Sequence, residues 1–291
     1  MIKHKICKIL LVILAIFLCV AFYELLGICV AYKKQPEVSN TTKKETKNGS
    51  WNECSENTER AVIIEKNPEA LLQRVRLIKN AKKEIILSTF AFQSDESGKL
   101  ILGALHDAAD RGVHIRLLVD GMESWIDMEG NPYFYGLSSH ENVEIKLYNK
   151  ANPLKPWKMM GRMHDKYLIA DGKRYILGGR NTYNYFLGDF PGHKNYDRDV
   201  LVVCDEPEKE NSVNQLLEYF ETIWEQEDSG YFHDNKKLAN RKSVKNAVLE
   251  LQNGYQKYFE ENKERICDTD YTDETFETEK IALVSNPIHT G

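Results

Sequence analysis

Apolar residues form one long run near the start of the chain and shorter, spaced runs after it. Ile9–Tyr23 is unbroken apolar sequence, and after Glu24 the run resumes over Leu25–Tyr32. Together the two runs reach about 24 residues, enough to cross a hydrocarbon core of roughly 30 Å at about 1.5 Å per residue. We therefore expect a membrane anchor over residues 1–34, with a cleaved signal peptide as the alternative.

The charges around this anchor bear on its orientation. Lysines flank the apolar run on both sides, at positions 3, 5 and 8 before it and at positions 33 and 34 after it. A short N-terminus ahead of a single span favours a cytoplasmic N-terminus. We expect a single-pass protein of the cell membrane, with its soluble part outside the cytoplasm.

Polar sequence and then a regular alternation of elements follow the anchor. Residues 35–60 are rich in Lys, Thr, Asn and Ser, which predicts a flexible linker. From residue 61 to about 265, expected strands (61–64, 84–92, 113–119, 143–147, 167–170, 175–177, 200–203) alternate with expected helices (67–80, 98–111, 212–225, 243–258). Asn67 and Pro68 open the first helix as a cap and a proline at the first helical position. The alternation predicts an α/β domain with a mixed β-sheet flanked by helices.

The end of the chain, residues 266–291, has a different pattern. After an acidic, polar stretch, Ile281–Val284 has the character of a new strand. This segment is either the start of a truncated second half, reached through a linker, or an edge strand that completes the existing sheet. The hydrophobic pattern leaves both interpretations open.

The distribution of charge indicates where an anion such as phosphate could bind. The 291 residues carry a formal net charge of -5, so no global field draws the protein towards nucleic acid or anionic lipid. Between Lys155 and Asn181, however, seven basic residues are opposed by two acidic ones. Any attraction for phosphate is expected from this stretch.

Residues that suit a phosphate site recur within the same stretch. The pattern predicts a strand from His164, a turn at Asp171, and a second strand that ends at a glycine pair, Gly178 and Gly179. Side chains alternate along a strand, so His164 and Lys166 share one face with Leu168 and Ala170, while Tyr167 and Ile169 take the other. Glycines let the backbone approach a ligand closely, and Asn181 follows them. An imidazole, an ammonium and an amide at one place make a phosphate-sized site that includes a nucleophile.

This spacing (His-x-Lys, four residues, Asp, six residues, Gly-Gly-x-Asn) resembles the signature motif of the phospholipase D superfamily and departs from it nowhere. Upstream, Asp95, Gly98 and residues 104–120 resemble the block that precedes the motif in bacterial cardiolipin synthases. The resemblance covers roughly residues 61–225. It implies a phospholipase D-like α/β fold and a phosphodiesterase or phosphatidyltransferase that acts on an anionic phospholipid such as phosphatidylglycerol.

The resemblance also implies a role for each residue of the motif. His164 would attack phosphorus and form a phosphohistidine, and Lys166 and Asn181 would bind the non-bridging oxygens. Asp171 would support its loop, and the glycine pair would lie against the substrate.

A carboxylate is also implied near the site, where it can hold an imidazole in its useful tautomer. Asp199 is the preferred candidate, with Asp197 close behind. The resemblance implies no metal and no cofactor, because lysine and amide groups do the work that magnesium does elsewhere.

The family's reaction uses two such motifs, with one histidine as nucleophile and the other as general acid. This sequence contains one; the remaining histidines of the soluble part (His106, His114, His140, His193, His233, His289) lack the pattern. The second histidine would come from a homodimer or from a downstream polypeptide that carries the other half. The alternatives are a nuclease of the same family active as a homodimer, for which no clear aromatic platform is present, and an inactive half that serves as a membrane-tethered binding module.

Overall fold

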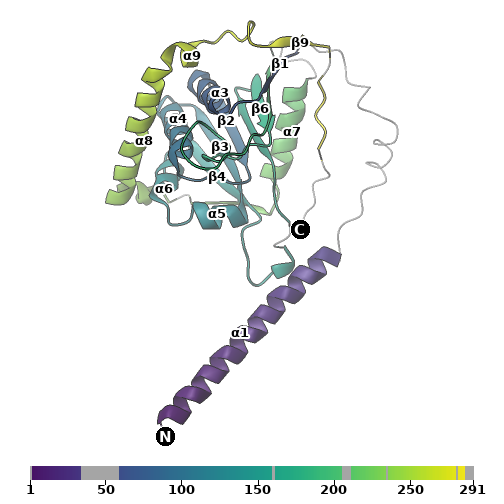
Figure 1. Ribbon diagram of the computed structural model, residues 1–291, viewed down its shortest axis with the longest axis vertical. Coiled ribbons are helices and arrows are strands. Elements are labelled where there is room, and N and C mark those ends of the chain that lie inside the picture. The colour runs from purple at the N-terminus through teal and green to yellow at the C-terminus, as the bar shows by residue number, and fades with distance from the viewer. Residues whose placement is uncertain are drawn as a thin grey trace.

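The computed structural model describes residues 2–33, 59–158, 161–204, 211–233, 235–279 and 281–285. Its parts are a long N-terminal helix and a layered α/β body (Figure 1). The linker expected over residues 35–60 lies outside these ranges, apart from Glu59 and Arg60, which begin the first strand.

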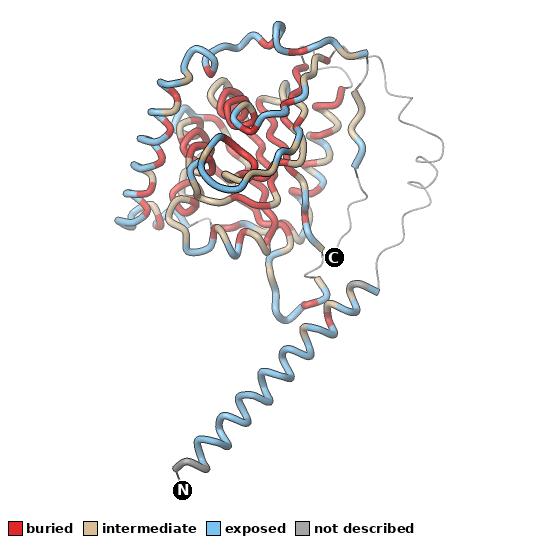
Figure 2. The backbone as a smooth tube through the Cα atoms, viewed as in Figure 1, coloured by how far each residue is buried: buried red, intermediate tan, exposed pale blue. Residues whose placement is uncertain are grey.

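The N-terminal helix, α1 (Ile2–Lys33), is the apolar run expected from the sequence. Its stretch Lys5–Ala31 is 27 residues long and apolar enough to cross a membrane, with a mean hydropathy that reaches 2.9. Figure 2 shows it extending away from the body with its surface exposed along most of its length. A contiguous apolar surface of this size is unfavourable in water, and α1 therefore has the length and surface of a membrane span.

A mixed β-sheet forms the middle layer of the body, as the alternation of elements predicted. Among the described residues its strand order is β8-β4-β3-β2-β5-β6-β7-β1-β9. β2, β3 and β4 are parallel, and all other neighbours pair antiparallel. The strands are β1 (Glu59–Ile64), β2 (Glu84–Thr89), β3 (His114–Asp120), β4 (Val143–Tyr148), β5 (Lys166–Ala170), β6 (Arg174–Gly178), β7 (Asp199–Cys204), β8 (Ser229–Tyr231) and β9 (Phe276–Thr278).

Helices cover both faces of the sheet. One face carries α3 (Asn67–Asn80), α4 (Glu96–Asp110), α6 (Pro132–Ser138), α8 (Lys242–Glu261) and α9 (Lys263–Cys267), and the other carries α7 (Ser212–Trp224) (Figure 1). The short helix α5 (Gly121–Asp127) follows β3, and two 3-10 turns, η2 (Pro156–Lys158) and η3 (Lys236–Asn240), lie in connections.

The alternation expected along the motif strand is confirmed by the two cores. Leu168 and Ala170 belong to the core under α3 and α4. Tyr167 and Ile169 belong to the core under α7. β5 is therefore buried on both faces. Its polar neighbours in sequence lie at the two ends of the strand, beyond the cores.

The cap expected at the start of α3 is wrong. Lys66, not Asn67, precedes the helix, and its side chain makes no cap hydrogen bond. Asn67 instead donates to the Asn195 carbonyl at 2.8 Å and accepts from Arg180 Nε at 3.1 Å. The side chain that a local pattern assigns to capping is used for contacts between distant parts of the chain.

The strand expected at Ile281–Val284 is also wrong. The Leu283 amide donates to Gln215 Oε1 at 2.8 Å, and the segment lies on α7 without a strand partner. The edge strand is β9, which pairs with β1 and comes from the stretch expected to be a polar linker. Ile266 and Tyr271 in that stretch are buried, so it packs as part of the body.

A buried ion cluster joins β7 to the helix layer and to the segment after β6. Asp199 Oδ2 lies 3.0 Å from Arg74 Nη1 and 3.2 Å from Arg180 Nη1. The side chains of Asp199 and Arg180 are fully buried and that of Arg74 is 5% exposed. Removing one partner of a buried charge cluster leaves the others uncompensated, which is costly.

We expect Asp199→Asn to lower the free energy of unfolding by about 3–5 kcal/mol, because two buried guanidinium groups lose their counter-charge. The measurement is urea unfolding of the full chain in detergent, followed by the fluorescence of Trp224, which is buried. The control is Arg198→Ala, which removes an exposed ion pair with Glu65 and should cost about 0.5 kcal/mol or less. Equal effects of the two substitutions would contradict the structural importance of the cluster.

Candidate active site

Several strand ends meet at one edge of the sheet, and the motif lies there. β2 and β5 are antiparallel neighbours with Thr89 opposite Lys166, so the end of β2 lies beside the start of β5. β6 returns to the same edge, where Gly178 pairs with Asp199 at the start of β7. Residues just before β5 and just after β6 are therefore brought together.

The continuation of β2 contacts two further residues of the motif. The ring of Phe90 packs edge-on against that of His164, with 4.7 Å between ring centroids and an interplanar angle of 61°. The Ala91 amide donates to Asn181 Oδ1 at 3.2 Å. Residues 89–91 thus contact His164, Lys166 and Asn181, the three residues expected to act on phosphate. Because the Asn181 oxygen accepts the hydrogen bond from Ala91, its Nδ2 group is the end of the side chain that can donate to a ligand.

His164 is exposed at this edge. The surrounding protein atoms, and then the charge of Lys166, lower the pKa of His164 below its ordinary value, against opposing effects of Asp165 and Asp120. A neutral imidazole has a free lone pair. At neutral pH His164 is therefore in the form that a nucleophile requires.

Lys166, two residues after the exposed histidine, is the first residue of β5 and is buried. Its Nζ donates to the His164 carbonyl at 2.7 Å and lies 5.2 Å from the centre of the Phe90 ring. Burial lowers the pKa of Lys166 to about 8, although the carboxylates of Asp165 and Asp197 act in the opposite direction. The ammonium is thus partly desolvated, and an anion that approaches it gains more than it would at a solvated lysine.

The arrangement suits a tetrahedral oxyanion. A neutral imidazole, an ammonium and an amide donor come from the segments before β5, in β5 and after β6, and all three rest on residues 89–91. Donors fixed by the sheet need no reorganisation as charge develops on a bound oxygen. The site therefore has an imidazole that can act as a nucleophile next to two groups that can stabilise negative charge.

Asp171, the aspartate of the motif, lies at the other end of β5. It occupies the turn after β5 with φ of 55°, about 17 Å along the strand from Lys166 if each residue rises about 3.3 Å. Its carboxylate accepts from the backbone amides of Lys82, Lys83 and Glu84 at 2.7–3.0 Å. Asp171 therefore holds the hairpin to the start of β2, a position that suits the supporting role expected for it.

The glycine pair makes room for carboxylates. A Cβ on Gly178 would collide with the Asp199 side chain and would lie 2.5 Å from the Arg198 carbonyl. A Cβ on Gly179 would collide with the Asp197 carboxylate. The space on the Cβ side of these glycines is occupied by this protein's own chain.

The two candidate carboxylates have different surroundings. Asp199 is buried against Arg74 and Arg180. Asp197 lies against Gly179, and its charge acts on Lys166. Of the two candidates, Asp197 is the one whose charge acts on Lys166, and Asp199 belongs to the buried ion cluster.

Residues outside the motif hold the segment that leads to His164. Asp120, the buried last residue of β3, accepts from the Met163 amide at 3.0 Å and pairs with Arg162 at 2.7 Å. Arg162 also pairs with Glu123 at 3.0 Å. The sequence signal for Asp120 was its position, because the carboxyl ends of parallel strands share one edge of a sheet, where ligands bind.

Comparison with known proteins identifies the family of the chain. Residues 74–224, just over half of the chain, match the family model described as the phospholipase D-like domain of cardiolipin synthase. An uncharacterized protein of Helicobacter pylori is 30% identical over 212 residues, which cover 68% of this chain and 39% of that protein. Cardiolipin synthase C of Escherichia coli is 29% identical over 171 residues, which cover 54% and 34%.

Among solved structures, phosphatidylserine synthase of Haemophilus influenzae has the same fold, with a TM-score of 0.50 and 18% sequence identity. The match covers 76% of this chain and 48% of that one. The chain spans about two fifths or less of the length of the two curated relatives named above.

The pKa of Lys166 yields a test of anion binding that needs no substrate. Sulfate keeps its charge between pH 6 and pH 10, whereas the ammonium of Lys166 is lost as the pH rises through about 8. We expect sulfate affinity to fall above pH 8 by up to about tenfold per pH unit, because only the protonated lysine binds. The measurement is calorimetric titration of the full chain in detergent.

The control is Lys166→Arg, whose guanidinium stays protonated throughout this range. Its sulfate affinity should be flat between pH 7 and pH 9.5. An equally flat profile for the unsubstituted chain would show that Lys166 does not hold the anion.

Proposed function

The chain belongs to the phospholipase D superfamily, and on this basis we propose that it is a membrane-anchored phosphodiesterase or phosphatidyltransferase that acts on phospholipids. The observation that carries the proposal is the meeting of His164, Lys166 and Asn181 at one sheet edge, in a chain whose first helix has the length and composition of a membrane span. The similarity to cardiolipin synthase C supports a lipid substrate. The substrate we propose is an anionic phospholipid such as phosphatidylglycerol.

In the first step the neutral imidazole of His164 attacks the phosphorus of the diester. A P–N bond forms while the P–O bond to the leaving alcohol breaks, which gives a covalent phosphohistidine. Lys166 and Asn181 bind the non-bridging oxygens, where negative charge increases.

In the second step water or an alcohol attacks the phosphohistidine. The P–N bond breaks, His164 is released, and the product is a phosphatidic acid or a new diester. The leaving alkoxide of the first step must take a proton, and the attacking hydroxyl of the second step must lose one. One further histidine can do both in turn.

The residues given contain a single motif, and we propose that the second histidine is supplied by a second copy or by a downstream polypeptide that carries the other half. A two-fold dimer would bring an identical edge opposite His164. A partner chain that carries the other motif would do the same.

We assign supporting roles to two carboxylates. Asp197 favours the ammonium form of Lys166, and Asp120 holds the segment 162–163 that leads to His164. Neither contacts phosphorus in the proposed mechanism, so both are positioning residues.

The substrate class is tested by supplying phosphatidylglycerol in mixed micelles and single-stranded DNA in parallel to the full chain, together with its second-motif partner where one is needed. Release of glycerol or formation of cardiolipin supports the proposal. Cleavage of DNA alone would favour the nuclease alternative. Activity on neither substrate would favour a binding module.

His164→Ala should abolish covalent labelling by a radiolabelled phosphodiester, because no other group at this edge is placed to form the P–N bond. The measurement is acid-labile, alkali-stable label on the full chain after quenching. The control is His140→Ala, whose imidazole pairs with Asp110 next to α4 and should leave labelling unchanged. Label retained on folded His164→Ala protein would mean that the nucleophile is another residue.

Turnover should depend on a second histidine. Without a general acid, expulsion of an alkoxide is expected to be about 100- to 10,000-fold slower. We expect the isolated monomer to be nearly inactive and specific activity to rise with protein concentration or with an added second-motif partner. Turnover is measured against concentration, with the mass determined by light scattering in detergent; full activity in a proven monomer would refute the requirement.

A further inference from the structure

Large apolar side chains are exposed on one side of the α/β body. Trp125 and Ile126 of α5 are 65% and 66% exposed, and Leu154 is 79% exposed. Trp157 of η2 is exposed as well. We call α5 together with residues 150–158 the apolar face; a cluster of this kind marks a surface that is covered by something other than water.

The apolar face adjoins the end of α1. The Tyr23 hydroxyl donates to the Leu154 carbonyl at 2.9 Å. Gly27 packs so closely on Pro156 that a Cβ at position 27 would collide with the proline ring. Figure 1 shows η2 beside the C-terminal part of α1, with the rest of the helix leading away from the body.

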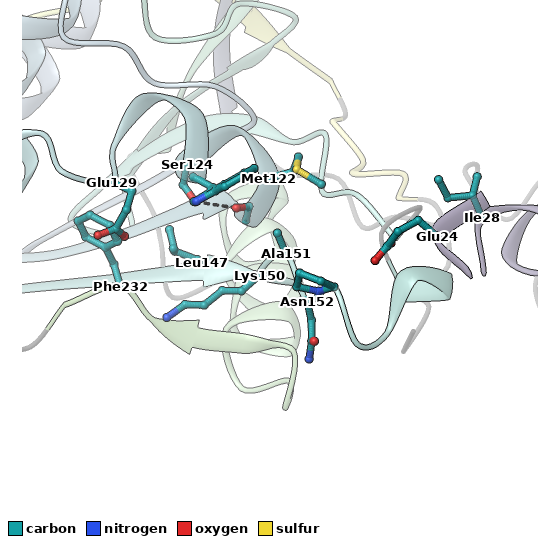
Figure 3. A pocket seen from close by; sticks show the side chains of 13 residues that line it. Glu24, Ile28, Met122, Ser124, Glu129, Leu147, Lys150, Ala151, Asn152 and Phe232 are labelled. Carbon is teal, nitrogen blue, oxygen red and sulfur yellow. Dashed lines mark hydrogen bonds between the residues drawn. The ribbon is translucent and has the colours of Figure 1, made fainter. Parts of the chain in front are cut away.

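A cavity of about 550 Å³ lies between α1 and α5. Glu24 and Ile28 border it from α1, and Met122 and Trp125 border it from α5. Figure 3 shows Glu24 and Ile28 on one side of this cavity and Met122 and Lys150 on the other. Helix and body therefore share a cavity that is bordered by both.

The depth of this cavity follows from the helix geometry. The 20 residues from Lys5 to Glu24 rise about 30 Å, the thickness of a hydrocarbon core. Lys8 can extend its amine towards the same surface as Lys5. If the hydrocarbon core is crossed by these 20 residues, Glu24 lies at its boundary, and Ile28, one turn further, lies at the level of the headgroups.

Aromatic residues gather at the same level. Tyr23 of α1 bonds to the loop that precedes η2, and Trp157 belongs to η2, which packs on α1. Trp125 borders the cavity between α1 and α5. Tyr and Trp are enriched where a membrane meets water, because their rings are apolar and their polar tips are hydrated. Lys33 and Lys155, which are exposed, add positive charge that anionic headgroups attract.

We propose that the apolar face docks on the surface of the bilayer that α1 crosses, with Trp125, Ile126, Leu154 and Trp157 inserted among the lipids and the cavity filled by acyl chain. The partner is a phospholipid leaflet with anionic headgroups. This inference rests on the membrane attachment put forward in the proposed function. It explains why Glu24 is tolerated in an apolar run, since it lies at the interface and not at mid-bilayer.

Docking would also orient the candidate active site. Glu123 of α5 pairs with Arg162, two residues before His164. A leaflet in contact with α5 therefore presents its phosphates next to the segment that carries the nucleophile. The diester could then be reached without extracting the lipid.

The test uses the full chain in phosphatidylcholine–phosphatidylglycerol vesicles whose acyl chains carry bromine, a short-range quencher of tryptophan. All variants carry Trp51→Phe, so the emitters are Trp125, Trp157 and the buried Trp224. Protein that floats with the vesicles should lose a large part of its emission. Trp125→Phe with Trp157→Phe should abolish this quenchable part.

The control adds Phe276→Trp to that double variant. Phe276 is 74% exposed in β9, at the end of the body opposite α5 (Figure 1), so the new emission should resist quenching. The docking would be overturned if Phe276→Trp were quenched as strongly as Trp125 and Trp157. It would also be overturned if Trp125 and Trp157 were not quenched in protein that floats. Failure to float would overturn both docking and attachment, while loss of lipid turnover with quenching intact would affect only the proposed function.

A kinetic comparison gives a second readout. Trp125→Ser with Ile126→Ser should lower turnover of phosphatidylglycerol in vesicles by about tenfold or more, because two side chains no longer enter the bilayer. Turnover of bis(p-nitrophenyl) phosphate, which is soluble in water, should not change. Leu249→Ser on α8 serves as the matched control for loss of an exposed apolar side chain; equal effects of both variants on vesicle lipid would contradict the proposal.

Discussion

The register between β2 and β5 is the constraint on which the candidate site depends. Side chains alternate along a strand, so a slip of one residue would turn Lys166 to the opposite face of the sheet. The pairing of Thr89 with Lys166 is supported at the far end of β5, where the Asp171 carboxylate accepts three backbone amides at the start of β2. An aspartate that lies a strand's length from the site therefore belongs to the same motif for a physical reason: it fixes the register that places the lysine.

Burial has opposite consequences for the charged groups near this edge. Asp199 and Arg180 are fully buried, and each has an opposite charge within about 3.2 Å that compensates its own. Lys166 is nearly as buried, yet the carboxylates around it do not offset its desolvation, and its pKa falls to about 8. The paired cluster is suited to holding β6 and β7 in place. The incompletely compensated lysine is suited to taking an anion from solution.

Much of the fold followed from the sequence because the relevant signals are local. The period of two along residues 167–170 predicted which side chains enter which core, and the helical spacing predicted α4, α7 and α8 to within a few residues. The sequence did not reveal contacts between residues that are far apart in the chain. Asn67 has the local features of a cap but binds Asn195 and Arg180. In the same way, the ion pairs that Asp199 makes with Arg74 and Arg180 distinguish its surroundings from those of Asp197. The motif itself placed His164, Lys166 and Asn181 together because the hairpin between them is short.

The parallel unit β2-β3-β4 explains why the apolar helix α1 contacts the body at the same strand ends that carry the motif. Three parallel strands direct their following segments to the same edge: Phe90 after β2, α5 after β3, and the loop of residues 150–158 after β4. That loop touches α1 and then runs within a few residues into His164. The strand ends that carry the candidate site and the surface beside α1 are therefore products of one topology. A crossover that reversed β4 would place the 150–158 loop, and α1 with it, at the opposite ends of the strands, near Asp171 and a strand's length from His164 and Lys166.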